Sequence, residues 1–161
     1  NGIKTYLPRI GLKMGIPDGL EKVTWFGTGP GESYSDSCQA AMVDLYSKGV
    51  DELYMPYVVP QENGNRTGIR WVSFATPHGI GFKVSSGALF SFSAHRFDVT
   101  DFDAATHTSD LVPREYITVN IDHAQRGIGS ASCGPELLPK YEVKPEPFKF
   151  DVEWAPLTGN E

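Results

Sequence analysis

The sequence predicts a mainly β protein, on two observations. Glycine and proline are frequent, at 17 and 12 of 161 residues, and β-branched and aromatic residues recur in short runs, a composition typical of short strands joined by turns. Several of these runs alternate polar with apolar side chains, which is the period of a strand with one buried face. The chain is long enough to bury a core without disulfides or metal ions. Because no repeat or linker divides it, we expect residues 1–161 to form a single domain.

The N-terminal third contains two expected strands and one candidate helix. Residues 3–14 read as an extended segment interrupted by Pro8, which can lie at a sheet edge or a bulge but not in a central ladder. Residues 21–26 read as a second strand. Residues 36–48 have a candidate N-cap in Asp36 and apolar side chains at helical spacing, so propensity by itself predicts a helix there.

The residue pattern in the middle of the chain predicts a hairpin and a long strand. Residues 54–76 place β-branched and aromatic side chains on both sides of Asn63-Gly64, which is the favoured pair for a type I′ turn. In the following strand Phe90 and Phe92 alternate with small and polar residues, so both rings are expected to face a core.

The C-terminal half predicts a short helix and two strands. Thr100 and Asp103 have the spacing of a capping box, which would open a helix over residues 101–107. Residues 116–122 and 148–154 alternate as strands. The second strand is expected to bury four apolar side chains on one face, namely Phe148, Phe150, Val152 and Trp154.

Charge and hydropathy exclude several classes of partner. The formal net charge is −6 and the basic residues are scattered, which argues against nucleic acids and anionic membranes. The sequence has neither a spanning apolar run nor the organisation of a signal peptide at its start, so we expect a soluble chain and favour the cytoplasm. The sequon Asn65-Arg66-Thr67 leaves secretion open. Cys38 and Cys133 are expected to be free buried thiols rather than a disulfide.

The residues carry no motif for metal, nucleophilic or phosphate chemistry. The segment 95–110 is rich in His and Asp but lacks the spacing of a zinc or calcium site, and helix capping with solvated loop charge is the simpler interpretation. A G-x-S-x-G nucleophile elbow is absent. The glycine-rich residues 127–132 are not followed by a helix that could bind phosphate. We expect no cofactor.

The tryptophans are the candidate carbohydrate-binding residues, because an indole ring can stack on the apolar face of a pyranose. Trp25 and Trp71 are the two that we assign to substrate binding. Core packing is the simpler interpretation for Trp25, and more so for Trp154.

Four motifs together resemble a known family. They are LPRIGLKMGIP (residues 7–17), VTWFGTGPGESYSD (23–36), YMPYVVPQENGNRTGIRW (54–71) and VNIDHAQRGIGSASCGP (119–135). In this order and spacing they resemble the C-terminal domain of the glycoside hydrolase family 2 β-galactosidases, the β-galactosidase small-chain domain. Four ordered motifs are much more specific than any one of them.

The resemblance implies an antiparallel β super-sandwich of the galactose-mutarotase-like kind. It also implies that residues 25–60 are largely extended or irregular, which disfavours a helix over 36–48. This chain resembles roughly the second half of the family's domain, and it begins inside a segment that reads as a strand. We therefore expect a part of a longer protein whose open edges favour contact with other domains or self-association.

The resemblance further implies a role in shaping the galactose pocket. The family's catalytic glutamates and metal ligands belong to a central barrel domain, and nothing in this sequence matches them. The loop after the GIG segment reaches the galactose pocket in the family, and in some members it carries a tryptophan that forms the pocket wall. Here Ser132, Cys133 and Gly134 take that place, with Cys133 where the tryptophan would stand. A thiol offers no stacking face.

Two functions follow from these observations. The first is the C-terminal part of a family 2 β-galactosidase, which completes the galactose pocket and supports assembly without catalytic residues of its own. The alternative is a stand-alone, lectin-like module that binds galactose or another carbohydrate through exposed aromatic rings. A mutarotase-like activity is weaker still, because no His/Glu acid-base pair can be placed by motif.

Overall fold

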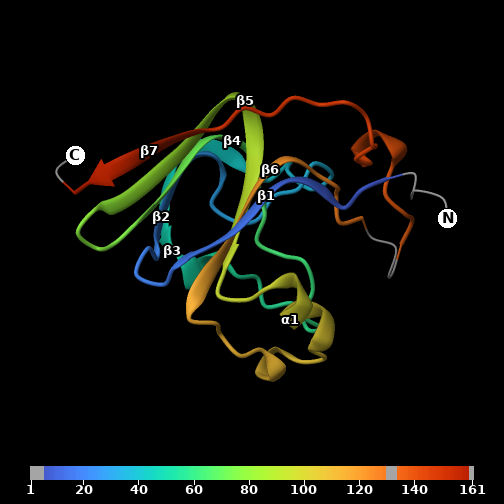
Figure 1. The fold of residues 1–161 in the computed structure, drawn as a ribbon. Helices are drawn as coiled ribbons and strands as arrows, with labels where there is room; N and C mark the ends of the chain where they lie inside the picture. Colours follow the sequence, from blue (N-terminus) through green and yellow to red (C-terminus); the bar gives the residue numbers. More distant parts are fainter. Residues whose placement is uncertain (1–5, 130–133, 160–161) are drawn as a thin grey trace.

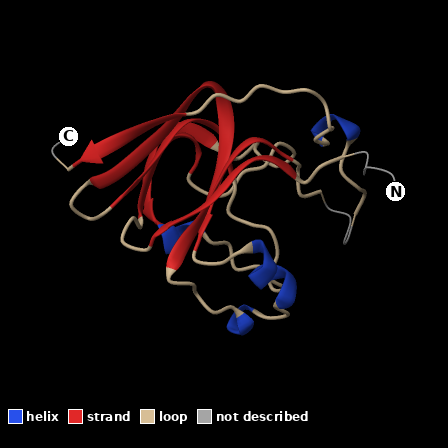
Figure 2. Ribbon diagram, viewed as in Figure 1, coloured by secondary structure: helices blue, strands red, loops and turns tan. Residues whose placement is uncertain are grey.

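The computed structural model describes residues 6–129 and 134–159, and in this part of the chain seven strands form one antiparallel sheet (Figures 1 and 2). The spatial order is β1-β6-β5-β4-β2-β3, with β7 paired to β5. The strands are β1 (Arg9–Pro17), β2 (Lys22–Gly29), β3 (Met42–Gly49), β4 (Arg66–Ala75), β5 (Ile80–His95), β6 (Tyr116–Gln125) and β7 (Glu153–Thr158). The described helices are α1 (Val99–Ala104) and the 3₁₀ turns η1 (Val50–Leu53), η2 (Thr108–Asp110) and η3 (Pro139–Tyr141). The predicted all-β antiparallel class with short helices is confirmed. Within the described residues no helix is long and apolar enough to span a membrane.

The long strand β5 organises the sheet. It has 16 residues, and its N-terminal half lies between β4 and β7 while its C-terminal half pairs with β6. The β4–β5 ladder shifts register on both sides of Ile69, and such irregularities bend a strand and increase its twist. The sheet therefore coils, as Figure 1 shows, instead of lying flat.

One face of the coiled sheet carries the apolar core. Phe90 and Phe92 are buried there, as the alternation in β5 predicts. The ring of Trp25 packs against Phe92 with 5.7 Å between centroids and against Tyr46 with 5.3 Å. The same cluster includes buried side chains of β2, β4 and β6, among them Val23, Val72, Phe74, Val119 and Ile121.

The opposite face of β5 and β6 is buried as well, but it is polar. Three cross-strand pairs line it, each residue at most 7% exposed: Ser91 with Asp122, Ser93 with Asn120, and His95 with Thr118. An antiparallel sheet often leaves such a face to solvent. Here the protein must supply the hydrogen bonds that water would otherwise make.

Residues 36–48 do not form the helix that propensity predicts. Strand β3 takes most of this segment and pairs along its whole length with β2. Backbone pairing with an existing strand overrides a weak helical preference. The extended segment implied by the family resemblance agrees with the structure.

The hairpin predicted around Asn63-Gly64 is wrong. Residues 54–65 form an irregular loop, and β4, which follows it, pairs with β2 and β5. Gly64 has a φ of +71°, so the conformation expected of a turn glycine is present. The flanking prolines, which lack an N–H donor, are unsuited to a ladder on the N-terminal side.

The short helix begins two residues earlier than predicted. Its N-cap is Asp98, and the capping box pairs Asp98 with Asp101 rather than Thr100 with Asp103. The spacing of the motif was right, but two overlapping pairs of the same type occur in this segment, and the structure uses the first.

The strand predicted over 148–154 is also wrong in its bounds. β7 covers Glu153–Thr158, where it pairs with the first half of β5. Phe148 is 56% exposed and Trp154 is 42% exposed, so neither is a core residue, whereas Phe150 and Val152 pack against the core.

Gly11 gives the first test of this architecture. It lies at a bulge between β1 and β6, and a Cβ atom there would stand 2.3 Å from Asp122 Oδ1 and 2.4 Å from the Ile121 carbonyl oxygen. Gly11→Ala is therefore expected to lower the free energy of unfolding by about 1–3 kcal/mol, measured by urea denaturation.

Gly19→Ala is the matched control, because a Cβ at Gly19 would meet no described atom within 4 Å. Its effect should stay within about 0.5 kcal/mol. Equal effects of the two substitutions would contradict the close approach of β1 to β6 at Gly11.

Candidate functional site

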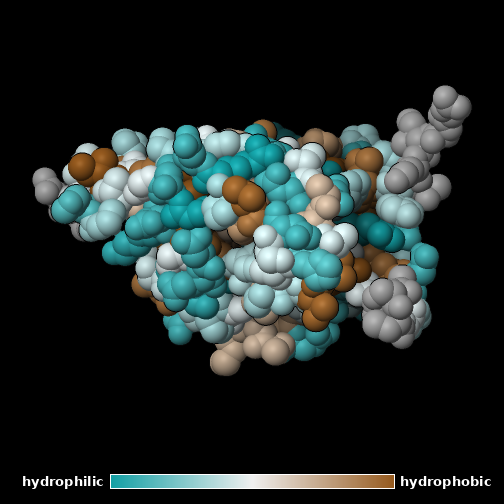
Figure 3. All heavy atoms as spheres, turned by 90° about the horizontal axis from the view of Figure 1, so that it is seen from below, coloured by the Kyte–Doolittle hydropathy of each residue, from teal (hydrophilic) through white to brown (hydrophobic). Residues whose placement is uncertain are grey.

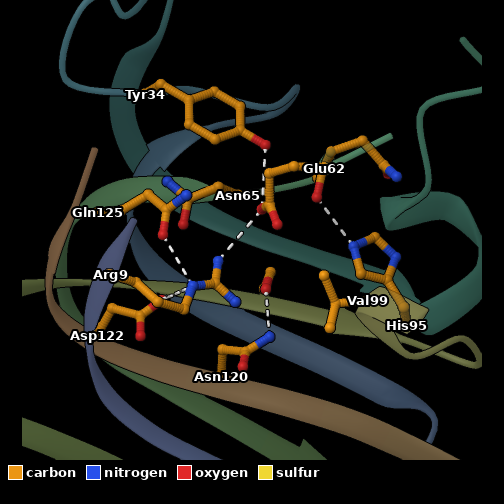
Figure 4. A network of polar contacts seen from close by, with 12 residues as sticks. Arg9, Tyr34, Glu62, Asn65, His95, Val99, Asn120, Asp122 and Gln125 are labelled. Carbon is orange, nitrogen blue, oxygen red and sulfur yellow. Dashed lines mark hydrogen bonds and ion pairs between the residues drawn. The ribbon is translucent and has the colours of Figure 1, made fainter. Parts of the chain in front are cut away.

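The four sequence motifs meet at one polar network on the buried face of β5 and β6 (Figure 4). Each motif contributes a side chain: Arg9 from the first, Tyr34 from the second, Glu62 from the third and Asp122 from the fourth. Residues that are far apart in the sequence thus share one set of contacts, and we take this network as the candidate site.

Arg9 lies at the centre of the network. Its Nε donates to Gln125 Oε1 at 2.9 Å, and its Nη2 donates to Glu62 Oε1 at 3.2 Å. The same Nε lies 3.5 Å from Asp122 Oδ2. The β1–β6 pairing sets Arg9 opposite Gln125, which accounts for the hydrogen bond between these two residues.

The two carboxyl groups are energetically unequal. Burial raises the pKa of Asp122 to about 7, with the charge of Glu62 adding to the effect and Arg9 opposing it. Burial also raises the pKa of Glu62, although Arg9 and Tyr34 act against this. The Glu62 side chain is 34% exposed and that of Asp122 is 1% exposed, so the charge on Asp122 is the more costly one. Carboxyl groups with raised pKa values are typical of functional sites.

His95 and Tyr34 are held in their uncharged forms. His95 Nε2 lies 2.9 Å from the backbone carbonyl oxygen of Asn63. Because a carbonyl only accepts, Nε2 carries the proton and Nδ1 is left as an acceptor. Burial lowers the pKa of His95 to about 4, so the imidazole is neutral at physiological pH. The Tyr34 hydroxyl donates to Glu62 Oε1 at 3.4 Å, and burial raises its pKa.

Residues of the second and third motifs fix the loop 54–65 over this network. Glu32 accepts hydrogen bonds from the Gly64 N–H at 2.7 Å and from the Tyr57 hydroxyl. The buried guanidinium of Arg66 donates to the carbonyl oxygens of Leu53 at 3.0 Å and of Gly64 at 2.6 Å. Charge-assisted bonds to backbone atoms give this irregular loop a defined position.

A cavity of about 380 Å³ lies beside the network. Arg9, Glu62 and His95 line its polar side, and Val99 and Phe102 of α1 form part of its apolar side. A second hollow of about 590 Å³ along β1 is more open and contains fewer network residues. Across residues 6–129 and 134–159, no three His, Cys, Asp or Glu side chains gather as a metal site would require.

Comparison with known proteins decides the family. Residues 1–154 match the family described as beta galactosidase small chain. The chain belongs to this family. The small-chain region is 38% identical over 146 residues to the β-galactosidase of Vibrio cholerae, 35% over 155 residues to that of Kluyveromyces lactis and 31% over 144 residues to that of Arthrobacter sp. strain B7.

The alignments cover 86%, 92% and 86% of the small-chain sequence, respectively, but only 14% of each of these relatives. The chain therefore spans about a seventh of the length of the curated β-galactosidases that it matches.

Of the small-chain residues predicted to approach substrate, Ser132 and Cys133 lie outside the described part, and Gly134 is exposed. The segment before them contacts Asp36 of the second motif. The Gly129 N–H donates to Asp36 Oδ2 at 2.9 Å, and Gly127 is so close that a Cβ would stand 2.3 Å from Asp36 Oδ1. The glycines thus permit contact with the second motif.

The three tryptophans have three different environments. Trp25 is fully buried, and its Nε1 donates to the Thr28 carbonyl oxygen at 2.9 Å, so its ring presents no face to a sugar in this fold. Trp71 is half-buried with Lys83 Nζ 5.5 Å from the ring centroid. Its stacking role stays a prediction. Trp154 is the exposed one, contrary to the expected core position.

The structure also shows the environments of the sequon residue Asn65 and of Cys38. Asn65 is fully buried and its Nδ2 donates to the Ser33 carbonyl oxygen at 2.8 Å, so its amide is not accessible to a glycan in the folded chain. Cys38 is a free, half-buried thiol, whereas Cys133 lies outside the described residues.

Sequence reasoning missed the network. Arg9, Glu62, Asp122 and Gln125 all lie within the four motifs, but none was singled out. The available signal lies in the polar positions of residues 91–95 and 118–122, but alternation alone does not indicate that this polar face is buried.

Asp122 predicts a pH dependence of stability. The pKa of Asp122 is higher in the folded chain than the usual value of 3.8, so its protonated form favours folding. The stability that this carboxyl contributes is fully present below about pH 4 and is lost as pH rises to about 7. Asp122→Asn should therefore gain stability relative to wild type across this range, by on the order of 3 kcal/mol. The quantity to measure is the unfolding free energy of Asp122→Asn minus that of wild type. His95 has a lowered pKa, so its contribution to stability rises with pH, but it does so in both proteins and cancels in the difference.

The measurement is urea denaturation of both proteins at intervals from pH 4.5 to 8. Val112→Ala, at a position that is 75% exposed, changes no titratable group and serves as the control, and its difference from wild type should not change with pH. If the difference in unfolding free energy between Asp122→Asn and wild type did not change with pH, burial would not raise the pKa of Asp122.

Proposed function

We propose that this chain is the C-terminal part of a family 2 β-galactosidase. In this role it completes the galactose pocket and supports assembly with the enzyme's other domains, and it contributes no catalytic residue. The observation that carries the proposal is the family match over residues 1–154 in a chain that covers only 14% of its β-galactosidase relatives.

The contribution to the pocket is assigned to the segment after β6. Gly127 and Gly129 lie against Asp36, and the Arg126 N–H donates to the Pro8 carbonyl oxygen at 3.0 Å. These contacts support a fixed direction for the backbone as it leaves the sheet. Small residues in the following positions would let the backbone approach a sugar held by other domains.

The contribution to assembly is assigned to β3. It forms one edge of the described sheet, and Met42, Val43 and Leu45 are 74%, 50% and 59% exposed. An apolar edge strand favours pairing with another chain or domain. The remaining domains of the enzyme, or a second copy of the chain, would cover it.

The catalytic part of this proposal is tested directly. The 161-residue chain is incubated with a nitrophenyl β-galactoside, and no turnover is expected. Replacing the matching region of the Vibrio cholerae β-galactosidase by this chain should give an active hybrid. Hydrolysis by the chain alone, or a folded but inactive hybrid, would overturn the proposal.

The pocket-shaping part is tested by Asp36→Ala in the same hybrid. Loss of the carboxylate frees the Gly129 N–H and is expected to lower kcat/KM by about 10- to 100-fold, since small displacements of substrate-contacting groups have effects of this size. Ser37→Ala, at an exposed neighbouring position, should leave kcat/KM unchanged. An unaltered kcat/KM in the Asp36 variant would exclude this segment from the pocket.

A further inference from the structure

The loop 54–65 contains a chemically labile pair of residues. The sequence has two Asn-Gly pairs, Asn1-Gly2 and Asn63-Gly64, and the second lies within the described residues. In such a pair the backbone nitrogen of the glycine can attack the side-chain amide of the asparagine, because glycine has no Cβ to hinder the approach. The product is a succinimide ring, which water opens to aspartate or isoaspartate.

The side-chain amide of Asn63 is buried and hydrogen-bonded at both atoms. Its Oδ1 accepts from the Met55 N–H at 3.0 Å, and its Nδ2 donates to the Gln61 carbonyl oxygen at 2.9 Å. The residue is 1% exposed. Ring closure brings Cγ within bonding distance of the Gly64 nitrogen and expels Nδ2, so the amide cannot keep both bonds. Breaking them in a buried place, where water does not replace them, opposes the reaction.

The backbone of the pair is held from two sides. The Asn63 carbonyl oxygen accepts from His95 Nε2 at 2.9 Å, and the Gly64 carbonyl oxygen accepts from Arg66 Nη1 at 2.6 Å. A Cβ at Gly64 would stand 2.6 Å from His95 Cε1 and 2.8 Å from the Leu53 carbonyl oxygen, so the packing is close as well. These contacts oppose the backbone rotation that ring closure requires.

Glu32 opposes the reaction most directly. The Gly64 nitrogen must lose its proton before it attacks, and its N–H donates to Glu32 Oε2 at 2.7 Å. Loss of the proton would leave a negative nitrogen beside a carboxylate, and two like charges this close together are strongly unfavourable. The carboxylate is a much weaker base than hydroxide, so it does not remove the proton itself. It therefore keeps the nitrogen in its unreactive form.

The outer side of the loop faces water. Tyr54, at the start of the loop, packs against Phe102 of α1 with 6.3 Å between ring centroids. Seen from the side of α1, the surface is mainly hydrophilic with separate apolar areas (Figure 3). Val58 and Val59 are already 89% and 60% exposed. Segments with exposed apolar side chains and irregular backbone open locally at a lower cost than global unfolding, and opening would bring water to Asn63.

We propose that Asn63 is a deamidation site that the folded loop keeps unreactive, and that Glu32 is the residue most responsible for this protection. When the loop opens, hydroxide removes the proton of the Gly64 nitrogen, which forms a bond to Asn63 Cγ. The bond from Cγ to Nδ2 breaks, and Nδ2 takes a proton from water and leaves as ammonia. A second water molecule opens the ring at either carbonyl. The proposal does not depend on the role of the chain in a β-galactosidase.

The test is peptide mapping by mass spectrometry, which resolves Asn63 from Asn1. The 161-residue chain is incubated at about 37 °C and pH 8 beside a synthetic peptide of residues 59–69, the unfolded reference. Asn63 should deamidate about 100-fold more slowly in the folded chain than in the peptide, because only the small opened population reacts. Equal rates would overturn the proposal, and this comparison needs no variant to fold.

Glu32→Gln tests the protecting residue, because glutamine keeps a hydrogen-bond acceptor and removes the charge. The deamidation rate of Asn63 in the folded variant should rise about tenfold over wild type, since the repulsion of the deprotonated nitrogen is lost. An unchanged rate would exclude Glu32 as the protecting group.

Val84→Ala is the matched control for a general loss of stability. Val84 is a fully buried core residue in the N-terminal half of β5, whereas His95 at the C-terminal end of this strand contacts the loop. The substitution lowers global stability by removing buried apolar volume, and it should leave the rate at Asn63 unchanged. An equal acceleration in Val84→Ala and Glu32→Gln would show that global unfolding controls the reaction, and the role of Glu32 would be lost.

Asn63→Asp reproduces one product of the reaction. Aspartate has no donor for the Gln61 carbonyl oxygen and places a carboxyl group at a buried position, so the urea midpoint should be lower than that of wild type. An unchanged midpoint would show that the amide of Asn63 is not held as described, and the proposed protection would have no basis.

Discussion

Arg9 links three segments of the chain through its guanidinium group. Its guanidinium reaches Glu62 in an irregular loop and Asp122 in the central strand β6, while its own backbone belongs to the edge strand β1. Only Asp122 of the three groups is fully buried, because the side chains of Arg9 and Glu62 are 25% and 34% exposed. Its charge is therefore the costly one, and Arg9 offsets part of that cost. Together with Glu32 and Arg66, which bond to the loop backbone, Arg9 positions the loop 54–65 beside the sheet.

The two buried faces of the sheet have different physical roles. The apolar face around Phe92 and Trp25 supplies the hydrophobic burial that stabilises the domain. The polar face adds little net stability, because each buried group must be paired to offset its desolvation. Its value lies in geometry: Glu32, Arg66 and Arg9 bond to defined backbone or side-chain atoms, and loops without regular structure thereby have single positions.

This geometry connects the network with the proposed role of the segment after β6. That segment begins beside Gln125, to which Arg9 donates a hydrogen bond, and continues to Gly129, whose N–H donates to Asp36. A rigid support of this kind is what a substrate-contacting loop requires.

The sequence by itself determined the fold class and most strands, because a period of two in residues such as 88–95 and 116–122 reports directly on a pleated backbone. The order of four motifs determined the family. Local propensity did not determine that residues 42–49 would be extended, although the family resemblance implied it, since the pairing with β2 decides against their helical spacing. The sequence also did not show that the polar residues of β5 and β6 would be buried. Alternation predicts an apolar and a polar face, but it does not indicate whether protein or solvent covers the polar face. The network of Arg9, Glu62 and Asp122 required the tertiary structure, since local pattern carries no information about which distant side chains share a counter-charge.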